Sequence, residues 1–318
     1  MSVTSIEPIA LSAGLSGYSG LVWLREWVKL YARAHWHRAA THAWLTQLSA
    51  QPLLTELLRT QPRLVHKIYR PYFSTTLTHA QRIDVLTAHY RFIAAQGLGS
   101  IVRRAARGPL HLGSVKGKSG TAYVMQLCAI SALEREGELV LQLLDNEGLL
   151  YSAAFCFLRD GMQMQVGLAC VQGPNYGDRQ ARVRAATRDL DGLRPKSLMV
   201  KLVEQWGRDH GCRSMLLVGN GNRPVHSAIR QGKVHADYDA LWCELGAQRR
   251  SDGNFVLPCD GHLPATAKGR QRHAMAMAFC DTMRSGLQGQ KHLHAIMTLA
   301  ADWTHDLCDP VGGQQRGA

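Results

Sequence analysis

The stretch from residue 121 to residue 172 limits the fold of this chain more than any other feature. It holds four apolar runs of strand length, separated by residues that favour turns: Glu136-Gly137, Asn146-Glu147-Gly148 and Asp160-Gly161. Such short connections join antiparallel neighbours, because a parallel pair needs a crossover of a dozen or more residues. The runs at 121–130, 138–144, 148–158 and 162–172 therefore predict an antiparallel meander of four strands.

The residues after the meander predict a crossover to a parallel strand. Gly173-Pro174-Asn175 ends the fourth strand, and a polar helix is expected near 178–190. A second helix begins at Pro195, since proline suits the first helical position. Ser214–Val218 is then a short buried strand, parallel to the fourth strand if these helices form a crossover. Short helices near 223–230 and 237–242 and a strand near 254–257 complete this part.

Residues 21–107 favour helices. Apolar residues recur at helical spacing over Leu21–Leu48, prolines delimit short helices near 53–60 and 63–69, and Thr78 is a suitable cap for another helix. Residues 113–119 resemble a phosphate-binding loop, but only three residues separate the two glycines and a strand follows, so we expect a basic turn. A basic helix is expected at 266–285.

The predicted fold class is α/β (α+β), a helical N-terminal region followed by a mixed sheet with crossover helices. The expected division is a basic helical region at 1–112, an α/β domain at 113–262 and a C-terminal helical tail at 263–318.

Positive charge is concentrated at the front of the chain. The formal net charge is +13, and residues 1–112 hold 13 Lys and Arg against 4 Asp and Glu. Such a surface favours an anionic macromolecule as partner: nucleic acid, anionic lipid or an acidic acyl-carrier protein. The alternative is that the excess arginine only keeps the chain soluble. We expect Arg103, Arg104 and Arg107 to contact the partner.

The eight cysteines form no CxxC pair and mostly lie in apolar runs, which predicts reduced, buried thiols and no metal site. Among the histidines of the first helix, 35 and 42 are expected to share a face, but no further ligand completes a metal set. No run of about 18 apolar residues is present, and residues 8–24 lack the basic start of a signal peptide. The expected location is the cytoplasm, with peripheral contact at the inner membrane.

Two groups of polar residues suggest chemistry. Arg194 and Lys196 stand at a helix start, where backbone N–H groups attract anions. After the short strand, His235 and Asp237 are candidates for a general base and its orienting carboxylate, and Tyr238 for a proton donor. The alternative is that Asp237 caps a helix and Trp242 fills the core.

Five segments in order resemble the VirK/YbjX family of Gram-negative bacteria: HKIYRPYFS (66–74), AHYRF (88–92), VQGP (171–174), LRPKSLMVKL (193–202) and KVHADYDALWCELG (233–246). The resemblance runs from about residue 60 to residue 285. It implies a cytoplasmic protein linked to virulence, to the display of surface proteins and to resistance against cationic antimicrobial peptides.

The order of elements also resembles the GNAT-type acyltransferase fold, in which the fourth and fifth strands splay apart around a thioester donor. The resemblance implies a donor site at Gln172, Gly173, Arg184, Arg194, Lys196, Ser197 and Asn220. The usual Q/R-x-x-G-x-G/A phosphate loop is absent, and residues 191–194 (DGLR) stand in its place. We therefore expect no tightly bound cofactor, and an acyl-carrier protein or an aminoacyl-tRNA as co-substrate in place of coenzyme A.

Two functions from different classes follow. The first is a GNAT-like acyl- or aminoacyl-transferase that acts on a peptide or an envelope component. The second is a non-catalytic, basic peripheral protein that binds anionic lipid or nucleic acid.

Overall fold

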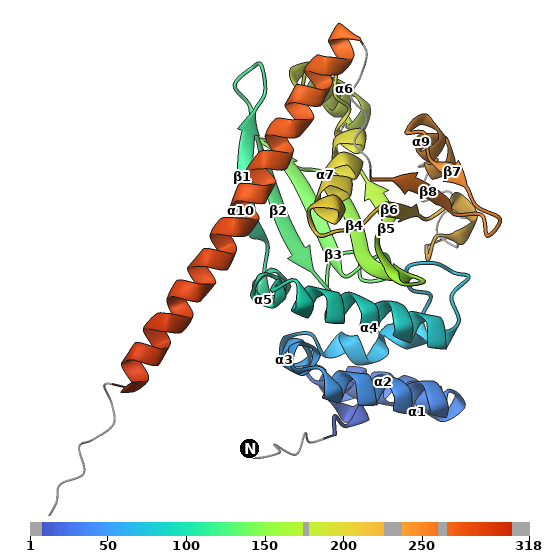
Figure 1. Cartoon of the computed structure of the whole chain (residues 1–318). Helices are drawn as coiled ribbons and strands as arrows, with labels where there is room; N and C mark the ends of the chain where they lie inside the picture. Colours follow the sequence, from blue (N-terminus) through green and yellow to red (C-terminus); the bar gives the residue numbers. More distant parts are fainter. Residues whose placement is uncertain (1–7, 174–177, 226–236, 260–265, 307–318) are drawn as a thin grey trace, which may run out of the picture.

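The computed structural model describes residues 8–173, 178–225, 237–259 and 266–306 (Figure 1). Its helices, with 3-10 helices written η, are η1 (Leu11–Leu15), α1 (Gly20–Trp36), α2 (Arg38–Ala50), α3 (Pro52–Thr60), η2 (Pro62–Tyr69), α4 (His79–Ala95), α5 (Gly99–Arg107), α6 (Arg179–Asp189), α7 (Pro195–Asp209), η3 (Asn220–Asn222), α9 (Tyr238–Glu244) and α10 (Ala267–Asp306). Its strands are β1 (Leu110–Lys116), β2 (Ala122–Ala129), β3 (Leu139–Asp145), β4 (Gly148–Asp160), β5 (Gln163–Gln172), β6 (Ser214–Leu217), β7 (Gln248–Arg249) and β8 (Phe255–Pro258).

The helical front part agrees with the sequence except that its first helix is interrupted. The single helix expected over Leu21–Leu48 is two helices, α1 and α2, which separate histidines 35 and 42. His37 lies between them with φ −117° and ψ 44°, outside the helical range, and its ring lies 4.1 Å from that of His79. Thr78 caps α4 as expected, since its hydroxyl accepts a hydrogen bond from the backbone N–H of Gln81.

The described strands form one sheet in the order β1-β2-β3-β4-β5-β6-β8-β7. Strands β2 to β5 are the predicted antiparallel meander. Strand β6 pairs in parallel with β5, and α6 and α7 make the crossover between them. The predicted fold class is confirmed: a helical N-terminal region precedes a mixed sheet, in the element order expected of a GNAT-type fold.

Residues 113–119, predicted as a basic turn, lie largely in an additional strand. β1 begins at Leu110, inside the region expected to be helical, and pairs antiparallel with β2. The register shifts between His111 and Gly113, and Gly113 has a φ of 136°, which glycine adopts without strain. This bulge interrupts the alternation that would have identified the strand. The turn is confined to Gly117–Gly120, where the N–H of Gly117 donates to the carbonyl of Thr121.

The helices α4 and α7 pack on the same face of the sheet. Phe157 of β4 lies 4.5 Å from Phe92 of α4, and Phe155 lies 5.2 Å from Trp206 of α7, measured between ring centroids. Because alternate residues of a strand share a face, both helices cover one side of β4. α10 is longer than predicted: it runs beside β1 and then continues beyond the sheet (Figure 1).

The three predicted domains share one core. A continuous cluster of buried apolar side chains extends from Leu15 in the helical region to Leu287 in α10. The division of the chain into three domains stays a prediction.

Candidate functional site

Most of the predicted site residues gather where β5 and β6 separate. The two strands pair only over Val166–Leu168 of β5, which then continues to its end at Gln172. Around this end of β5 lie Gln172, Gly173, Arg194, Lys196, Asn220, Asp237 and Tyr238. β6 ends at Leu217, so the last residues of β5 have no neighbouring strand on this side, and the donor site that the acyltransferase resemblance implies stays a prediction.

Asp237 caps α9. Its carboxylate accepts hydrogen bonds from the N–H of Ala240 (3.1 Å) and from the side-chain amide of Asn220 (2.7 Å). These two donors lower the pKa of Asp237, so the carboxylate is ionised at neutral pH. The capping role, which the sequence left open, is therefore present. His235 lies outside the described residues, so its pairing with Asp237 stays a prediction.

Tyr238 is buried, and its hydroxyl is engaged with the backbone of β5. It accepts a hydrogen bond from the N–H of Val171 (2.8 Å) and donates to the carbonyl of the same residue (2.9 Å). The guanidinium of Arg223 lies 3.8 Å from the centre of the ring. Burial, followed by the neighbouring Cys170 thiol, raises the pKa of Tyr238 well above its ordinary value. Trp242 on the same helix is fully buried and fills the core.

The cations at the start of α7 have local partners. Arg194 forms an ion pair with Glu244 of α9. Burial, followed by repulsion from Arg194, lowers the pKa of Lys196. An anion at this helix start would therefore compete with Glu244 for Arg194.

Other predicted residues lie elsewhere. Ser197 lines a separate groove of about 570 Å³ between α7, β8 and α10, and Arg184 is exposed on α6, where it donates to Gln180. On α5, Arg103 pairs with Glu56 (2.6 Å), and Arg107 is exposed. Within the described ranges no cluster of three metal-ligating side chains occurs. The contribution of Arg103, Arg104 and Arg107 to partner binding stays a prediction.

The outer face of α1 is a second candidate site, which the sequence analysis missed. Ten large hydrophobic side chains are exposed in the described part of the chain, and eight of them belong to α1: Leu21, Val22, Trp23, Leu24, Trp27, Val28, Tyr31 and Trp36. The spacing of these residues predicted a helix but did not show which side faces the core. An exposed apolar face of this kind marks an interaction surface.

The side chains of α1 divide into three stripes. The rings of Trp23, Trp27 and Tyr31 follow one another along one flank, with centroids 6.4 and 4.8 Å apart. Residues three and four apart share a helix face, so Leu21, Leu24 and Val28 form an aliphatic crest beside them. Arg25 and Lys29 lie on the other flank, and buried Glu26 and Leu30 attach the helix to the body.

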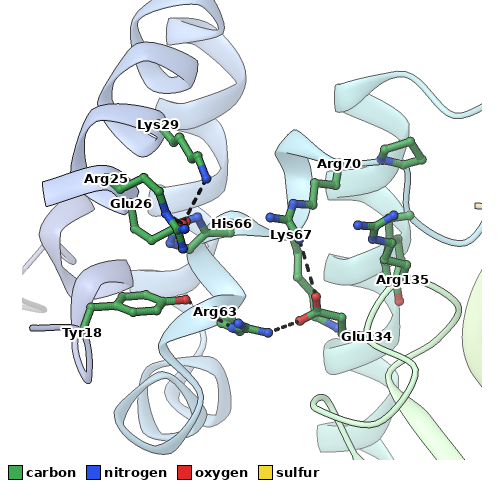
Figure 2. A pocket seen from close by; sticks show the side chains of 12 residues that line it. Tyr18, Arg25, Glu26, Lys29, Arg63, His66, Lys67, Arg70, Glu134 and Arg135 are labelled. Carbon is green, nitrogen blue, oxygen red and sulfur yellow. Dashed lines mark hydrogen bonds and ion pairs between the residues drawn. The ribbon is translucent and has the colours of Figure 1, made fainter. Parts of the chain in front are cut away.

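Beside the basic flank of α1 is a pocket of about 300 Å³ (Figure 2). We call it the basic pocket. It lies between α1, η2 and the connection from β2 to β3, and its lining is Tyr18, Arg25, Glu26, Lys29, Arg63, His66, Lys67, Arg70, Pro71, Tyr72, Glu134 and Arg135. Much of the HKIYRPYFS segment is therefore in its wall.

No helix in the described ranges is long and apolar enough to cross a membrane. This finding agrees with the expectation of no spanning segment.

Comparisons with known proteins add family context. The model of the DUF535 family, described as a protein of unknown function, matches residues 20–268. The chain is 25% identical over 220 residues to YbjX of Escherichia coli K12, covering 68% of this chain and 67% of YbjX. It is 23% identical over 251 residues to a protein of Haemophilus influenzae, covering 77% of this chain and 82% of that protein.

Among solved structures, a mutant cAMP-binding acyltransferase from Mycobacterium smegmatis aligns with a TM-score of 0.31 and 10% identity. The alignment covers 68% of this chain and 63% of that one. A similarity of this size carries no argument about activity.

Proposed function

This chain belongs to the DUF535 family, and we propose that it is a peripheral protein that binds anionic lipid surfaces through the outer face of α1. The family match and the similarity to YbjX confirm the resemblance to the VirK/YbjX family. The description of the family names no activity. The observation that carries the proposal is the concentration of eight exposed large hydrophobic side chains on one helix.

The aliphatic crest supplies the apolar contribution. Leu21 is 85% exposed, and Leu24 and Val28 are about half exposed, so much of their surface is available to a partner. Burial of a fully exposed side chain of this kind contributes roughly 1.5–3 kcal/mol, and a half-exposed one about half as much. The neighbouring tryptophans and tyrosine are the residues that concentrate at the level of lipid headgroups. A helix with this pattern lies in the plane of the interface.

The charge of the surroundings favours an anionic lipid over a neutral one. Arg25 and Lys29 flank the crest, and the basic pocket lies on the same side of α1. A Lys or Arg close to an anionic membrane contributes about 1 kcal/mol to binding. Under this proposal the protein acts at the cytoplasmic face of the inner membrane, as the sequence analysis expected.

The transferase hypothesis has less support from the geometry and stays a prediction. A thioester donor beside the end of β5 would pair with backbone groups that β6 does not reach. The hydroxyl of Tyr238 already occupies both polar groups of Val171. A donor carried by an acyl-carrier protein or a tRNA would therefore have to displace Tyr238 from a buried position.

Co-sedimentation with lipid vesicles tests the proposal. We expect the protein to sediment with vesicles of phosphatidylethanolamine and phosphatidylglycerol and not with vesicles of phosphatidylcholine alone. The emission of the α1 tryptophans should shift to shorter wavelength on binding. The double variant Leu24→Asp/Val28→Asp should bind at least ten-fold more weakly, because it removes two apolar side chains and adds two negative charges.

Met162→Asp is the matched control, since Met162 is 96% exposed and lies outside α1. Its binding should remain within about two-fold of wild type, because under the proposal Met162 does not meet the membrane. Equal binding of wild type and the α1 variant would exclude α1 as the lipid-binding face. Binding that does not depend on lipid charge would exclude the anionic preference.

A further inference from the structure

The basic pocket carries more positive charge than its carboxylates neutralise. Six Lys and Arg side chains line it, against the two carboxylates of Glu26 and Glu134. Glu26 contacts both cations of the α1 flank, Arg25 (3.1 Å) and Lys29 (3.2 Å). The excess charge therefore lies mainly on the opposite wall, which is formed by η2, the residues after it and the connection from β2 to β3.

The arginines of this wall are held loosely by their neighbours. Glu134 lies between Arg63 and Arg70 (Figure 2), with nitrogen–oxygen distances of 3.5 and 3.8 Å. Both exceed the 2.7–2.9 Å typical of a charge-assisted hydrogen bond. The Nε of Arg63 also donates to the hydroxyl of Tyr18 (3.3 Å), so the N–H groups that remain available on this residue are the terminal ones. The side chain of Arg135 has no hydrogen bond or ion pair with any residue in the described ranges.

The pocket is nevertheless firmly positioned. The N–H of Phe73 donates to the carbonyl of Arg135 (2.7 Å), which ties the segment after η2 to the connection between β2 and β3. Lys67 at the base of the pocket pairs with the buried carboxylate of Glu138. Three arginines with free N–H groups are therefore presented by segments whose backbones are fixed, which lowers the cost of ordering them around a ligand.

His66 adds a neutral polar edge. Its Nε2 lies 2.9 Å from the carbonyl of Gly14 and can bond there only as an N–H donor. Burial lowers the pKa of His66, so the ring is uncharged at neutral pH. The attraction for an anion thus comes from the arginines, whose planar guanidinium groups can donate two hydrogen bonds to the oxygens of one phosphate.

We infer that the basic pocket binds a phosphate ester, with Arg63, Arg70 and Arg135 as its ligands. A volume of about 300 Å³ is at the lower end for small-molecule sites, which suits a phosphate with a headgroup of glycerol size. The ester has two sources: a lipid headgroup beside the inserted face of α1, or a soluble phosphate ester. The lipid source rests on the proposed function, whereas the phosphate site itself does not.

The test compares two double variants that remove the same charge. Arg63→Gln/Arg70→Gln alters the pocket, and Arg59→Gln/Arg91→Gln alters exposed arginines of α3 and α4. Calorimetry with glycerol 1-phosphate measures the soluble ester, and co-sedimentation with phosphatidylglycerol vesicles measures the lipid. Arg135→Gln is a third variant, whose side chain has no structural bond to lose among the described residues.

We expect the pocket variant and Arg135→Gln to lose at least ten-fold in affinity for one or both probes, with the control within about two-fold of wild type. Loss for the vesicles, with or without loss for glycerol 1-phosphate, identifies the lipid headgroup as a source. Loss for glycerol 1-phosphate alone identifies a soluble ester. The inference is overturned if the pocket variants and the control behave alike with both probes.

The two proposals fail in different ways. If the wild-type protein does not bind vesicles but binds glycerol 1-phosphate through the pocket, the proposed lipid-binding function is wrong and the phosphate site is supported. If vesicle binding depends on Leu24 and Val28 but not on the pocket variants, the lipid function stands without a headgroup site. Thermal melts of all variants, compared with wild type, show whether any loss arises from unfolding.

Discussion

The hydroxyl of Tyr238 closes the gap between β5 and β6 by bonding both polar backbone groups of Val171, at 2.8 and 2.9 Å. Tyr238, predicted as a proton donor, thus makes the hydrogen bonds to Val171 that a neighbouring strand would otherwise make. β5 extends past its parallel pairing with β6, and Tyr238 satisfies backbone groups that would otherwise be buried without partners.

Tyr238→Phe should therefore destabilise the fold. The substitution keeps the ring but leaves the N–H and the carbonyl of Val171 unpaired in a buried position, which costs roughly 1–3 kcal/mol. Urea denaturation measures the change in the free energy of unfolding. Tyr31→Phe, at an exposed position of α1, is the control and should have no measurable effect. An unchanged stability for Tyr238→Phe would favour a catalytic over a structural hydroxyl.

The ion pair between Lys67 and Glu138 should be strongly coupled. Both side chains are almost fully buried, and Glu138 also accepts a hydrogen bond from Tyr90. Glu138→Gln leaves the ammonium of Lys67 buried without a counter-ion, and such changes cost about 3–5 kcal/mol. The double variant Lys67→Met/Glu138→Gln removes the unpaired charge.

A double-mutant cycle in urea measures this coupling. We expect the double variant to be more stable than Glu138→Gln alone, by an amount on the order of 2 kcal/mol. The reason is that substitutions of two residues in contact do not have additive effects on the free energy of unfolding. Additive effects of the two substitutions would show that water reaches Lys67 and compensates its charge.

Local signals account for the parts of the fold that the sequence predicted. The turn at Asp160-Gly161 and the proline at the start of α7 act through the residues beside them, so they are readable without tertiary structure. β1 escaped prediction because the bulge at Gly113 breaks its alternation after three residues.

The candidate sites depend on tertiary contacts that no local pattern contains. Leu24 and Leu30 are both apolar and both on α1, yet Leu24 is half exposed and Leu30 is fully buried. Spacing identifies a helix but not which side of it meets the core. The basic pocket brings Arg63 and Arg70 together with Arg135, which is more than 60 residues away in the sequence. Counting charges along the chain does not show that these residues are neighbours. The gap residues Asn220 and Asp237 were found because they follow a recognisable strand.

A glycine in α10 should be required by close packing. Gly286 faces β1, and a Cβ at this position would overlap the backbone carbonyl of Leu112. Alanine in a helix is normally favoured over glycine by about 1 kcal/mol. Gly286→Ala should nevertheless lower the melting temperature, because α10 would have to move away from β1. Gly289→Ala, where a Cβ meets nothing within 4 Å, should raise it.

His89 should make the protein less stable in mild acid. Burial, followed by repulsion from Lys67, lowers the pKa of His89 to about 3, whereas an unfolded histidine titrates near 6.5. Between these values the unfolded chain binds one more proton at this residue than the folded chain does. The free energy of unfolding therefore falls as the pH falls below 6.5, by about 1.4 kcal/mol per unit for this one group.

His89→Gln isolates this contribution. The Nδ1 of His89 accepts a hydrogen bond from the N–H of Phe157 (3.1 Å), and a glutamine oxygen is a replacement acceptor that does not titrate. Other groups titrate equally in both proteins, so the difference in stability between wild type and variant cancels them. From pH 7.5 to pH 5 this difference should shift by about 2 kcal/mol in favour of the variant. A constant difference would mean that His89 is protonated in the folded protein, which would require a counter-ion at its buried Nε2.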